Sequence, residues 1–410
     1  MSRRICVVTA GRLSTCPRML KAADAFHEAG YRVRMVSTRT AGWTTAADEE
    51  IAASRGWQWR VVNYGRAEAP ATWLRSGARH KAARAFANLV TSVPPSVATA
   101  AFARVHRELV DAILEEPSDL IYGGTAGAIA AAAEAGRRSG SAFAVDFEDY
   151  HCAEHASPDR DLSNSLGGLV MRSASEGAAF VTAGSAAIAR ACEDELGIRA
   201  MPIHNVFSLP ASAPSRPTGE HAFSAYWFSQ TIGAGRGLED IVRALGVTAR
   251  PASLNLRGCA IPGYVEGLLG LARTAAPRVD IRVMPPVGPA RMVEECRAFD
   301  VGIAAEPGQA RNNALALSNK ATTYPLAGLP VMMTNTIGQR PLAEDLGEGA
   351  LLFVPGDHEG LAQQLLPLMT NGDRLARAGA ASWEAARRRW HWEHELERGA
   401  LLAAAAKVLS

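Results

Sequence analysis

The feature that most constrains the fold is an alternation of short apolar runs with longer stretches of helical spacing. At the start of the chain, the apolar run Ile5–Thr9 precedes Arg18–Ala29, in which apolar residues recur every three or four positions up to Gly30. This alternation is typical of strand–helix units that build parallel sheets. Because the chain has 410 residues, it is long enough for two or three such domains. We therefore predict an α/β protein.

The alternation occurs in two series, separated by a stretch rich in proline near residues 206–221 that favours a linker. The apolar runs predict strands at Ile5–Thr9, Arg32–Ser37, Leu120–Tyr122, Ala142–Asp146, Phe180–Ala183, Ala225–Phe228, Ser253–Arg257, Asp280–Val283, Val301–Ala304, Val331–Met333 and Leu351–Val354. The series therefore predict two Rossmann-like halves of similar size. After them, Ala380–Leu409 has the spacing of one long helix, and its tryptophans Trp383, Trp390 and Trp392 need a large surface to pack on. A tail that crosses back to the first half would supply it.

Composition excludes several classes of protein. Hydrophobic residues make up 48% of the chain and charged residues 20%, which excludes intrinsic disorder, and a net charge of +2 argues against nucleic acid as a partner. The six cysteines form no C-x-x-C pair, so we expect reduced thiols and a cytoplasmic location. No run of about 20 apolar residues predicts a membrane span, and the first apolar run is too short for a signal peptide. The oligomeric state is left open between a monomer and a homodimer.

A glycine-rich loop, Ser229–Gly237, follows a predicted strand and opens a predicted helix. Gly233 and Gly235 allow close backbone approach, the start of the helix favours an anion, and Arg236 adds a full positive charge. These properties fit a diphosphate, whereas a surface turn is the simpler interpretation of the loop taken alone. The loop does not match the G-x-G-x-x-G pattern, so a dinucleotide site is not expected.

The most specific stretch reads Ser-Asn-Lys-Ala-Thr-Thr-Tyr-Pro-Leu-Ala-Gly-Leu-Pro-Val over Ser318–Val331. It resembles a segment of the GT-B glycosyltransferases, and among them retaining family 4. The resemblance implies two Rossmann-like domains facing across a cleft: residues 1–207 would bind the acceptor, residues 208–384 would bind the donor, and residues 385–410 would cross back onto the first domain. It also implies transfer of a sugar from a UDP- or GDP-sugar with retention of configuration, and without a metal or other cofactor.

The resemblance extends to individual donor-site residues. Arg236 and Lys320 would neutralise the leaving diphosphate, helped by the backbone at Gly235 and Asn319, and Glu306 would hold the sugar. Met284 and Pro285 would lie near the nucleobase, and Arg311 would be a third cation. The remaining donor-binding residues would be Gly233, Ser318 and Thr323. Among the positions that depart from the family pattern, Thr323 stands where a glutamate usually binds ribose, and Ala314 stands where a second glutamate usually follows Glu306.

Acids and histidines gather in Asp146–His155, directly after a predicted strand of the first half. Glu148, Asp149 or His151 would orient or deprotonate the acceptor, and a capped, solvated loop is the alternative. The loop after the first strand would face the same site, with Gly11 and Arg18 as acceptor-binding residues. A salt bridge is an equally good interpretation of Arg18. No spacing in Asp146–His155 fixes the tetrahedral geometry of a metal site, so none is predicted.

Between Ala69 and Arg107 the chain has no acidic residue. The cations of this stretch are Arg75, Arg79, Lys81, Arg84, Arg104 and Arg107. With Trp73 and Phe86 nearby, they suit a membrane-surface segment or a dock for an anionic acceptor, and a solvated helix face is the plainer alternative.

The acceptor itself is open at this point. A nearly neutral chain with no predicted span favours a small soluble metabolite, as in bacterial secondary metabolism, over a lipid or polysaccharide acceptor at the membrane surface. Three other functions compete: a sugar-nucleotide 2-epimerase, a catalytically weak partner subunit, and a nicotinamide-dependent dehydrogenase.

Overall fold

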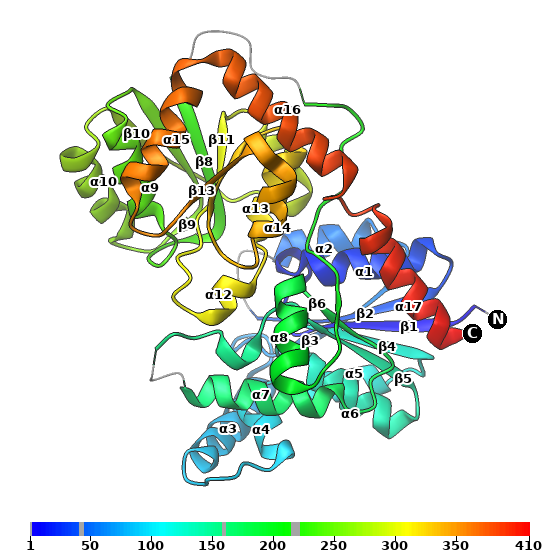
Figure 1. Ribbon diagram of the computed structural model, residues 1–410. Coiled ribbons are helices and arrows are strands. Elements are labelled where there is room, and N and C mark those ends of the chain that lie inside the picture. Colours follow the sequence, from blue (N-terminus) through cyan, green and yellow to red (C-terminus); the bar gives the residue numbers. More distant parts are fainter. Residues whose placement is uncertain (1, 41–44, 158–160, 215–221) are drawn as a thin grey trace. The chain divides into compact units, whose positions relative to one another are not determined.

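The computed structural model describes residues 2–40, 45–157, 161–214 and 222–410 (Figure 1). The chain forms two compact units. The N-terminal unit contains Met1–His204, Ala310–Asn312 and Glu395–Ser410, and the C-terminal unit contains Asn205–Gln309 and Asn313–His394. The first unit is therefore built from three separate stretches of the chain.

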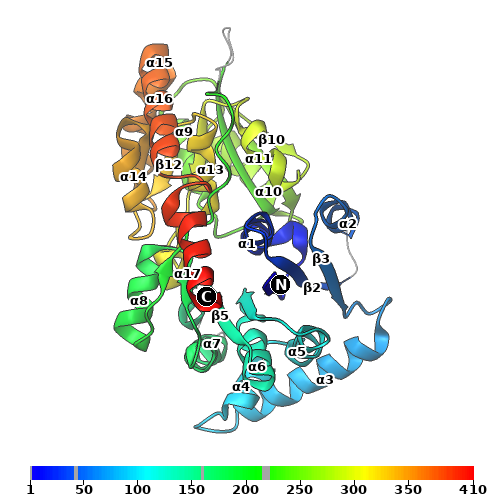
Figure 2. The ribbon, with the colours of Figure 1, turned by 90° about the vertical axis from the view of Figure 1, so that its right-hand side faces the viewer.

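The N-terminal unit is a parallel sheet of seven described strands in the order β3-β2-β1-β4-β5-β6-β7. The strands are β1 (Arg4–Thr9), β2 (Arg32–Arg39), β3 (Gln58–Asn63), β4 (Leu120–Gly124), β5 (Ala142–Phe147), β6 (Val181–Ala183) and β7 (Met201–Pro202). The helices are α1 (Pro17–Glu28), α2 (Thr45–Ala53), α3 (Pro70–Ala87), α4 (Pro95–Phe102), α5 (His106–Leu114), α6 (Ile129–Ser139), α7 (Asp161–Ser175), α8 (Ala186–Leu196) and α17 (Ala400–Leu409). Figure 2 shows α1 and α17 on one face of this sheet and α5 and α6 on the other.

The C-terminal unit is a parallel sheet of six described strands in the order β10-β9-β8-β11-β12-β13. The strands are β8 (Phe223–Ile232), β9 (Ala252–Ala260), β10 (Val279–Met284), β11 (Val301–Ala304), β12 (Val331–Thr334) and β13 (Ala350–Phe353). The helices are α9 (Leu238–Val247), α10 (Tyr264–Ala275), α11 (Met292–Cys296), α12 (Arg311–Leu315, which begins in the N-terminal unit), α13 (Asn319–Leu326), α14 (Arg340–Leu346), α15 (His358–Thr370) and α16 (Gly372–Arg388). Its core packs Trp227 and Leu254 of the central strands against Leu238 and Leu245 of α9.

The predicted fold class is confirmed, because the chain has two parallel, Rossmann-like sheets and a strand at every position where the sequence predicts one. Two strands are not predicted, β3 and β7. In β3 only Val62 is buried, and β7 has two residues, so neither gives a continuous apolar run. Residues 203–214 carry no helix or strand, as expected for the start of the linker, and residues 215–221 lie outside the described ranges.

The prediction of one long C-terminal helix is wrong. Helix α16 ends at Arg388, the chain turns, and a π-helical segment (Glu395–Gly399) leads into α17. The buried Trp390 and Trp392 lie in this turn and pack within the C-terminal unit, where Trp390 Nε1 donates to Asp345 Oδ2 at 2.9 Å. The tryptophans therefore do not need the first half as a packing surface. None of the described helices has the length and apolar character needed to cross a membrane.

Candidate functional site

The predicted donor residues of the C-terminal unit lie on loops at one edge of its sheet. Strands β8, β10 and β11 run parallel, so the loops that follow them leave the sheet at the same edge. The first four residues of the glycine-rich loop belong to β8, and Gly233–Gly237 connect β8 to α9, with φ of +75° at Gly235 and +68° at Gly237. A Cβ on Gly237 would lie 2.9 Å from Cβ of Ala305, so this loop packs against the end of β11, where Glu306 follows. The absence of a side chain allows that approach.

Arg236 lies half-buried in the glycine-rich loop, one residue before the cap of α9. Within the described part of the chain, no hydrogen bond or ion pair engages its guanidinium. The acids in the first turn of α9 are occupied, since Glu239 accepts from the Tyr264 hydroxyl at 2.9 Å and Asp240 from the Gly356 amide at 2.8 Å. An unpaired guanidinium beside the amino end of a helix is suited to bind an anion.

Lys320 and Glu306 form a buried ion pair at the same edge. Lys320 Nζ lies 2.9 Å from Glu306 Oε1, and the side chains are only 8% and 12% exposed. Lys320 Nζ also lies 5.9 Å from the ring centroid of Trp227, and the Glu306 amide donates to Thr334 Oγ1 at 2.8 Å. Two residues predicted to bind different parts of one donor are therefore adjacent. Each neutralises the other, so a bound diphosphate and sugar would have to replace this contact.

The loop predicted to meet the nucleobase is fixed by a residue that the sequence analysis missed. Arg257, a buried residue of β9, donates to the Pro285 carbonyl at 2.7 Å. Its guanidinium also donates to the Tyr226 hydroxyl at 2.6 Å and to Glu295 at 2.7 Å. These bonds hold the loop that carries Met284 and Pro285. The signal in the sequence was an arginine within a predicted buried strand, which requires a partner of opposite charge.

Two predicted donor residues, Thr323 and Arg311, already have partners within the chain. Thr323 is fully buried, and its hydroxyl donates to the Asn319 carbonyl at 2.6 Å, because that side of α13 faces the core. Arg311 belongs to the N-terminal unit, where it pairs with both carboxylate oxygens of Glu195, one of them at 2.7 Å. The Thr323 hydroxyl and the Arg311 guanidinium thus already have partners within the chain, and a bound donor would have to replace these contacts. Ser318 lies at the N-cap of α13, with no described hydrogen bond from its side chain to the helix end.

In the N-terminal unit, Arg18 lies in a buried ion pair with Asp146. It is 4% exposed, and Nε and Nη2 donate to the two carboxylate oxygens of Asp146 at 2.6 and 2.5 Å. This contact is the salt bridge that is the other interpretation of Arg18 in the sequence. Gly11 uses its own backbone groups locally, donating to Thr9 Oγ1 at 3.0 Å and accepting from the Thr38 amide at 3.1 Å.

The carboxyls of Glu148 and Asp149 follow β5 and lie half-buried. Burial and the negative charge of Asp149 raise the pKa of Glu148 to about 7, against the opposing charge of Arg18. Burial also raises the pKa of Asp149, whose Oδ1 accepts from Asn312 Nδ2 at 2.8 Å. A carboxyl that titrates near neutrality can accept a proton from an acceptor hydroxyl. This chemistry supports the predicted role of Glu148.

His151 lies beside these carboxyls but is only 2% exposed. Its Nδ1 bonds Glu154, and its Nε2 has no partner among the described residues. Burial lowers the pKa of His151. The bond to Glu154 and the charges of Asp149 and Glu148 raise it by more than burial lowers it, so the net shift is upward. A buried imidazole bonded to a carboxylate is better placed to support the loop than to touch an acceptor. Throughout the described ranges, no group of three or more histidine, cysteine and acidic residues is placed to hold a metal.

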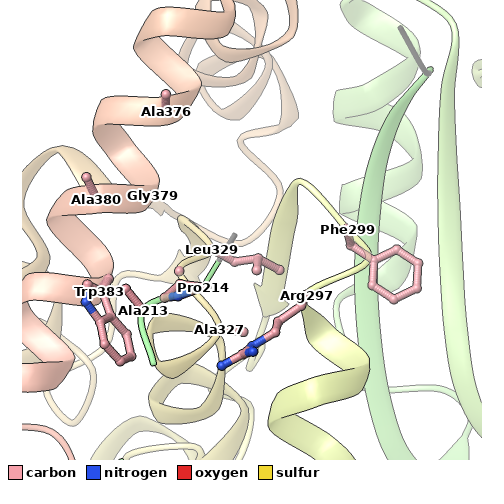
Figure 3. Close-up of a pocket in the computed structure, with 11 residues that line it drawn as sticks. Ala213, Pro214, Arg297, Phe299, Ala327, Leu329, Ala376, Gly379, Ala380 and Trp383 are labelled. Atoms are coloured by element: carbon pink, nitrogen blue, oxygen red, sulfur yellow. The ribbon is translucent and has the colours of Figure 1, made fainter. Parts of the chain in front are cut away.

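A cavity of about 280 Å³ lies elsewhere in the C-terminal unit. Two residues of its wall precede strands, Phe299 before β11 and Leu329 before β12. The cavity therefore lies at the sheet edge opposite the loops that follow β8, β10 and β11. Figure 3 shows that α16 supplies another part of its wall through Ala376, Gly379 and Trp383. The cavity is therefore separate from the candidate donor site.

Comparison with solved structures identifies the fold. The Anabaena protein HepE in complex with UDP-glucose matches with a TM-score of 0.67 at 17% identity over 99% of each chain. Sucrose-phosphate synthase from Thermosynechococcus elongatus matches with a TM-score of 0.68 at 14% identity over the full length of both chains. A Listeria monocytogenes protein provisionally assigned as a UDP-N-acetylglucosamine 2-epimerase matches with a TM-score of 0.59 at 12% identity, covering 100% of this chain and 97% of that one.

By sequence, no family model and no curated protein matches the chain. At these identities the structural matches establish the fold, and they extend over the whole chain. The resemblance to GT-B proteins is therefore confirmed at the level of the fold, and the chain has a GT-B-like fold built from two Rossmann-like units.

Proposed function

We propose that this chain is a glycosyltransferase that moves a sugar from a nucleoside diphosphate sugar, with uridine or guanosine as the base, to an acceptor. The observation that carries the proposal is the buried Lys320–Glu306 pair, which shares a sheet edge with Arg236, a guanidinium without a partner among the described residues. A cation for the diphosphate and a carboxylate for sugar hydroxyls are thus adjacent. HepE, crystallised with UDP-glucose, has the same fold.

In this proposal, Arg236 and Lys320 stabilise the negative charge that develops on the leaving diphosphate. Backbone N–H groups at Gly235 and Asn319 add to them, and together they supply the charge that a metal would otherwise supply. Glu306, released from Lys320 by the donor, accepts hydrogen bonds from the sugar. Glu148 accepts the proton of the acceptor hydroxyl. Retention of configuration and the absence of a metal are part of the proposal, as is a small soluble acceptor bound by the N-terminal unit.

The donor site is tested by the binding of UDP and GDP to variants, measured by calorimetry. Arg236→Ala and Lys320→Gln should each weaken binding by about 10- to 100-fold, because each removes a charge-assisted bond to phosphate. Glutamine at 320 can still donate a hydrogen bond to Glu306, which limits damage to the fold. The matched control is Arg243→Ala on α9, because Arg243 pairs with Asp240 and lies away from the glycine-rich loop. If both site variants bound nucleotide as wild type does, the donor site would lie elsewhere.

A sugar-nucleotide 2-epimerase is the second candidate, because the Listeria monocytogenes protein assigned to that activity shares the fold. An epimerase needs no separate acceptor and would convert the bound sugar nucleotide by itself. Incubation of the chain with UDP-N-acetylglucosamine alone, followed by NMR, separates the two. A new sugar-nucleotide isomer would replace the glycosyltransferase proposal, whereas an unchanged sugar nucleotide would exclude the epimerase for this substrate.

A further inference from the structure

Helix α3 presents an apolar face to solvent. Ala71, Leu74, Ala78, Ala82 and Ala85 are all exposed, and their spacing of three or four residues places them along one side of the helix. Leu89, just beyond the helix, continues the row and is 85% exposed, while Leu74 is 64% exposed. We call these six residues the α3 outer face. Phe86, at its border, is 45% exposed. In Figures 1 and 2, α3 lies at the margin of the N-terminal unit, packed against α4.

Two cations border this face. At 100° per residue, Arg75 and Lys81 lie about 60° to either side of its centre. Arg75 bonds only the Ala71 carbonyl of its own helix, at 3.3 Å, and Lys81 has no partner among the described residues. Both side chains are exposed. The outer face is therefore an apolar strip with a free positive charge on each side.

Three other cations of the region, Arg79, Arg84 and Arg104, are partly buried and hold the helix in place. Arg79 pairs with Glu108 at 2.6 Å, Arg84 donates to Ser163 Oγ at 3.2 Å, and Arg104 donates to the Trp73 carbonyl at 2.6 Å. These bonds fix which side of α3 points outward. The outward side of α3 is therefore solvated and, between Arg75 and Lys81, apolar.

We propose that the α3 outer face binds the surface of a bilayer that contains anionic lipids. The apolar strip would enter the boundary between headgroups and acyl chains, while Arg75 and Lys81 reach phosphates on either side. Charge complementarity favours this partner, because the chain has no acidic residue from Ala69 to Arg107 that would be repelled. A second copy of the chain fits less well, since it would bring like charges together at the edges of the strip. A shallow row of alanines also offers no groove to a protein partner.

The test is co-sedimentation with large vesicles of phosphatidylcholine alone or of equal parts phosphatidylcholine and phosphatidylglycerol. We expect wild type to bind the phosphatidylglycerol vesicles and to lose most of that binding in high salt. Leu74→Gln/Leu89→Gln and Arg75→Gln/Lys81→Gln should each reduce the partition coefficient by at least about tenfold. All four side chains are exposed, so the variants should keep the thermal stability of the wild type. The matched control is Val247→Gln/Leu366→Gln, which removes two exposed apolar residues of the C-terminal unit.

Three results would overturn the proposal. The first is no sedimentation of wild type with phosphatidylglycerol vesicles. The second is equal binding by wild type and both α3 variants. The third is a dimer in light scattering that Leu74→Gln/Leu89→Gln abolishes, because the face would then join two copies of the chain. None of these measurements depends on the donor site, so the membrane proposal and the glycosyltransferase proposal can fail separately.

Discussion

The surroundings of Glu148 move its ionisation to near neutral pH. Its pKa of about 7, against an ordinary value of 4.5, means that the folded chain keeps this proton at a pH where the unfolded chain has lost it. Between pH 4.5 and about 7, the folded state therefore binds more protons than the unfolded state does. As a result, the free energy of unfolding falls as pH rises through this window and stays lower above it.

Replacing Glu148 with glutamine should remove that loss of stability. The difference in the free energy of unfolding between Glu148→Gln and wild type should change in favour of the variant by about 1 to 3 kcal/mol from pH 5 to pH 8. The measurement is urea denaturation at both values. Glu115→Gln is the control, because Arg60 lowers the pKa of Glu115 and its contribution is already constant above pH 5. If the Glu148 variant showed the same flat difference as the control, the carboxyl would titrate normally.

At this scale the sequence shows which residues share a loop but not which residues pair. Glu306 and Lys320 were expected in one site because the family resemblance assigns both to the donor, and in the structure both follow strand β11. Arg18 pairs with a residue 128 positions away, and Arg311 with one 116 positions away. Such partners are set by tertiary packing, so the sequence could not indicate that these guanidinium groups are already neutralised.

At the scale of elements, the position of the loop within Asp146–His155 depends on the close approach of helix α7. A Cβ on Gly167 would lie 2.2 Å from the His151 carbonyl oxygen, whereas a Cβ on Gly168 would meet only Cys152 Sγ at 3.4 Å. Gly167→Ala should therefore displace the loop that carries Glu148, and Gly168→Ala should not. We expect turnover to fall at least about tenfold in the first variant while UDP affinity is kept, since the donor residues lie in the other unit.

The neighbouring glycines make this comparison a matched pair. Both substitutions add the same methyl group to the same helix, so they should raise its intrinsic stability equally. Steady-state kinetics and UDP calorimetry on both variants are sufficient. Equal turnover in the two variants would show that the position of the loop does not matter for the reaction.

The elements themselves were largely predictable, because strand and helix signals are local. Buried strands such as β1 and β12 are continuous apolar runs, and α1 ends where Gly30 follows it with a φ of +88°. The break after α16 was not predictable, since no proline or glycine marks residues 389–394. Burial of Trp390 and Trp392 in the C-terminal unit turns the chain there, and burial is a property of the tertiary fold.

At the scale of the whole molecule, the last 16 residues belong to the unit that the first residues begin. Glu397 is fully buried in it; its Oε2 accepts from the His204 amide at 2.5 Å, and its Oε1 lies 2.8 Å from His204 Nδ1. Arg398 pairs with Glu28 of α1 at 2.8 Å. The C-terminal segment is therefore a structural part of the N-terminal unit.

Removing the Glu397 carboxylate should destabilise that unit alone. Glu397→Ala leaves the His204 amide buried without an acceptor, at a cost of about 1 to 3 kcal/mol. In chemical denaturation, the transition of the N-terminal unit should move to lower denaturant, while the transition that UDP stabilises should stay in place. The exposed Glu395→Ala in the same segment is the control. A shift of both transitions together would mean that the two units unfold as one.

This discontinuous architecture also affects the order of folding during synthesis. The ribosome releases Glu397 only after the whole C-terminal unit has been made, about 190 residues after His204. At about 5 to 20 residues per second, the nascent first unit waits roughly 10 to 40 seconds for its closing helix. During that time the face of its sheet that α17 will cover stays open, while the second unit, which is nearly continuous in sequence, can finish folding first. The part of the chain that is made first is thus the last to be completed.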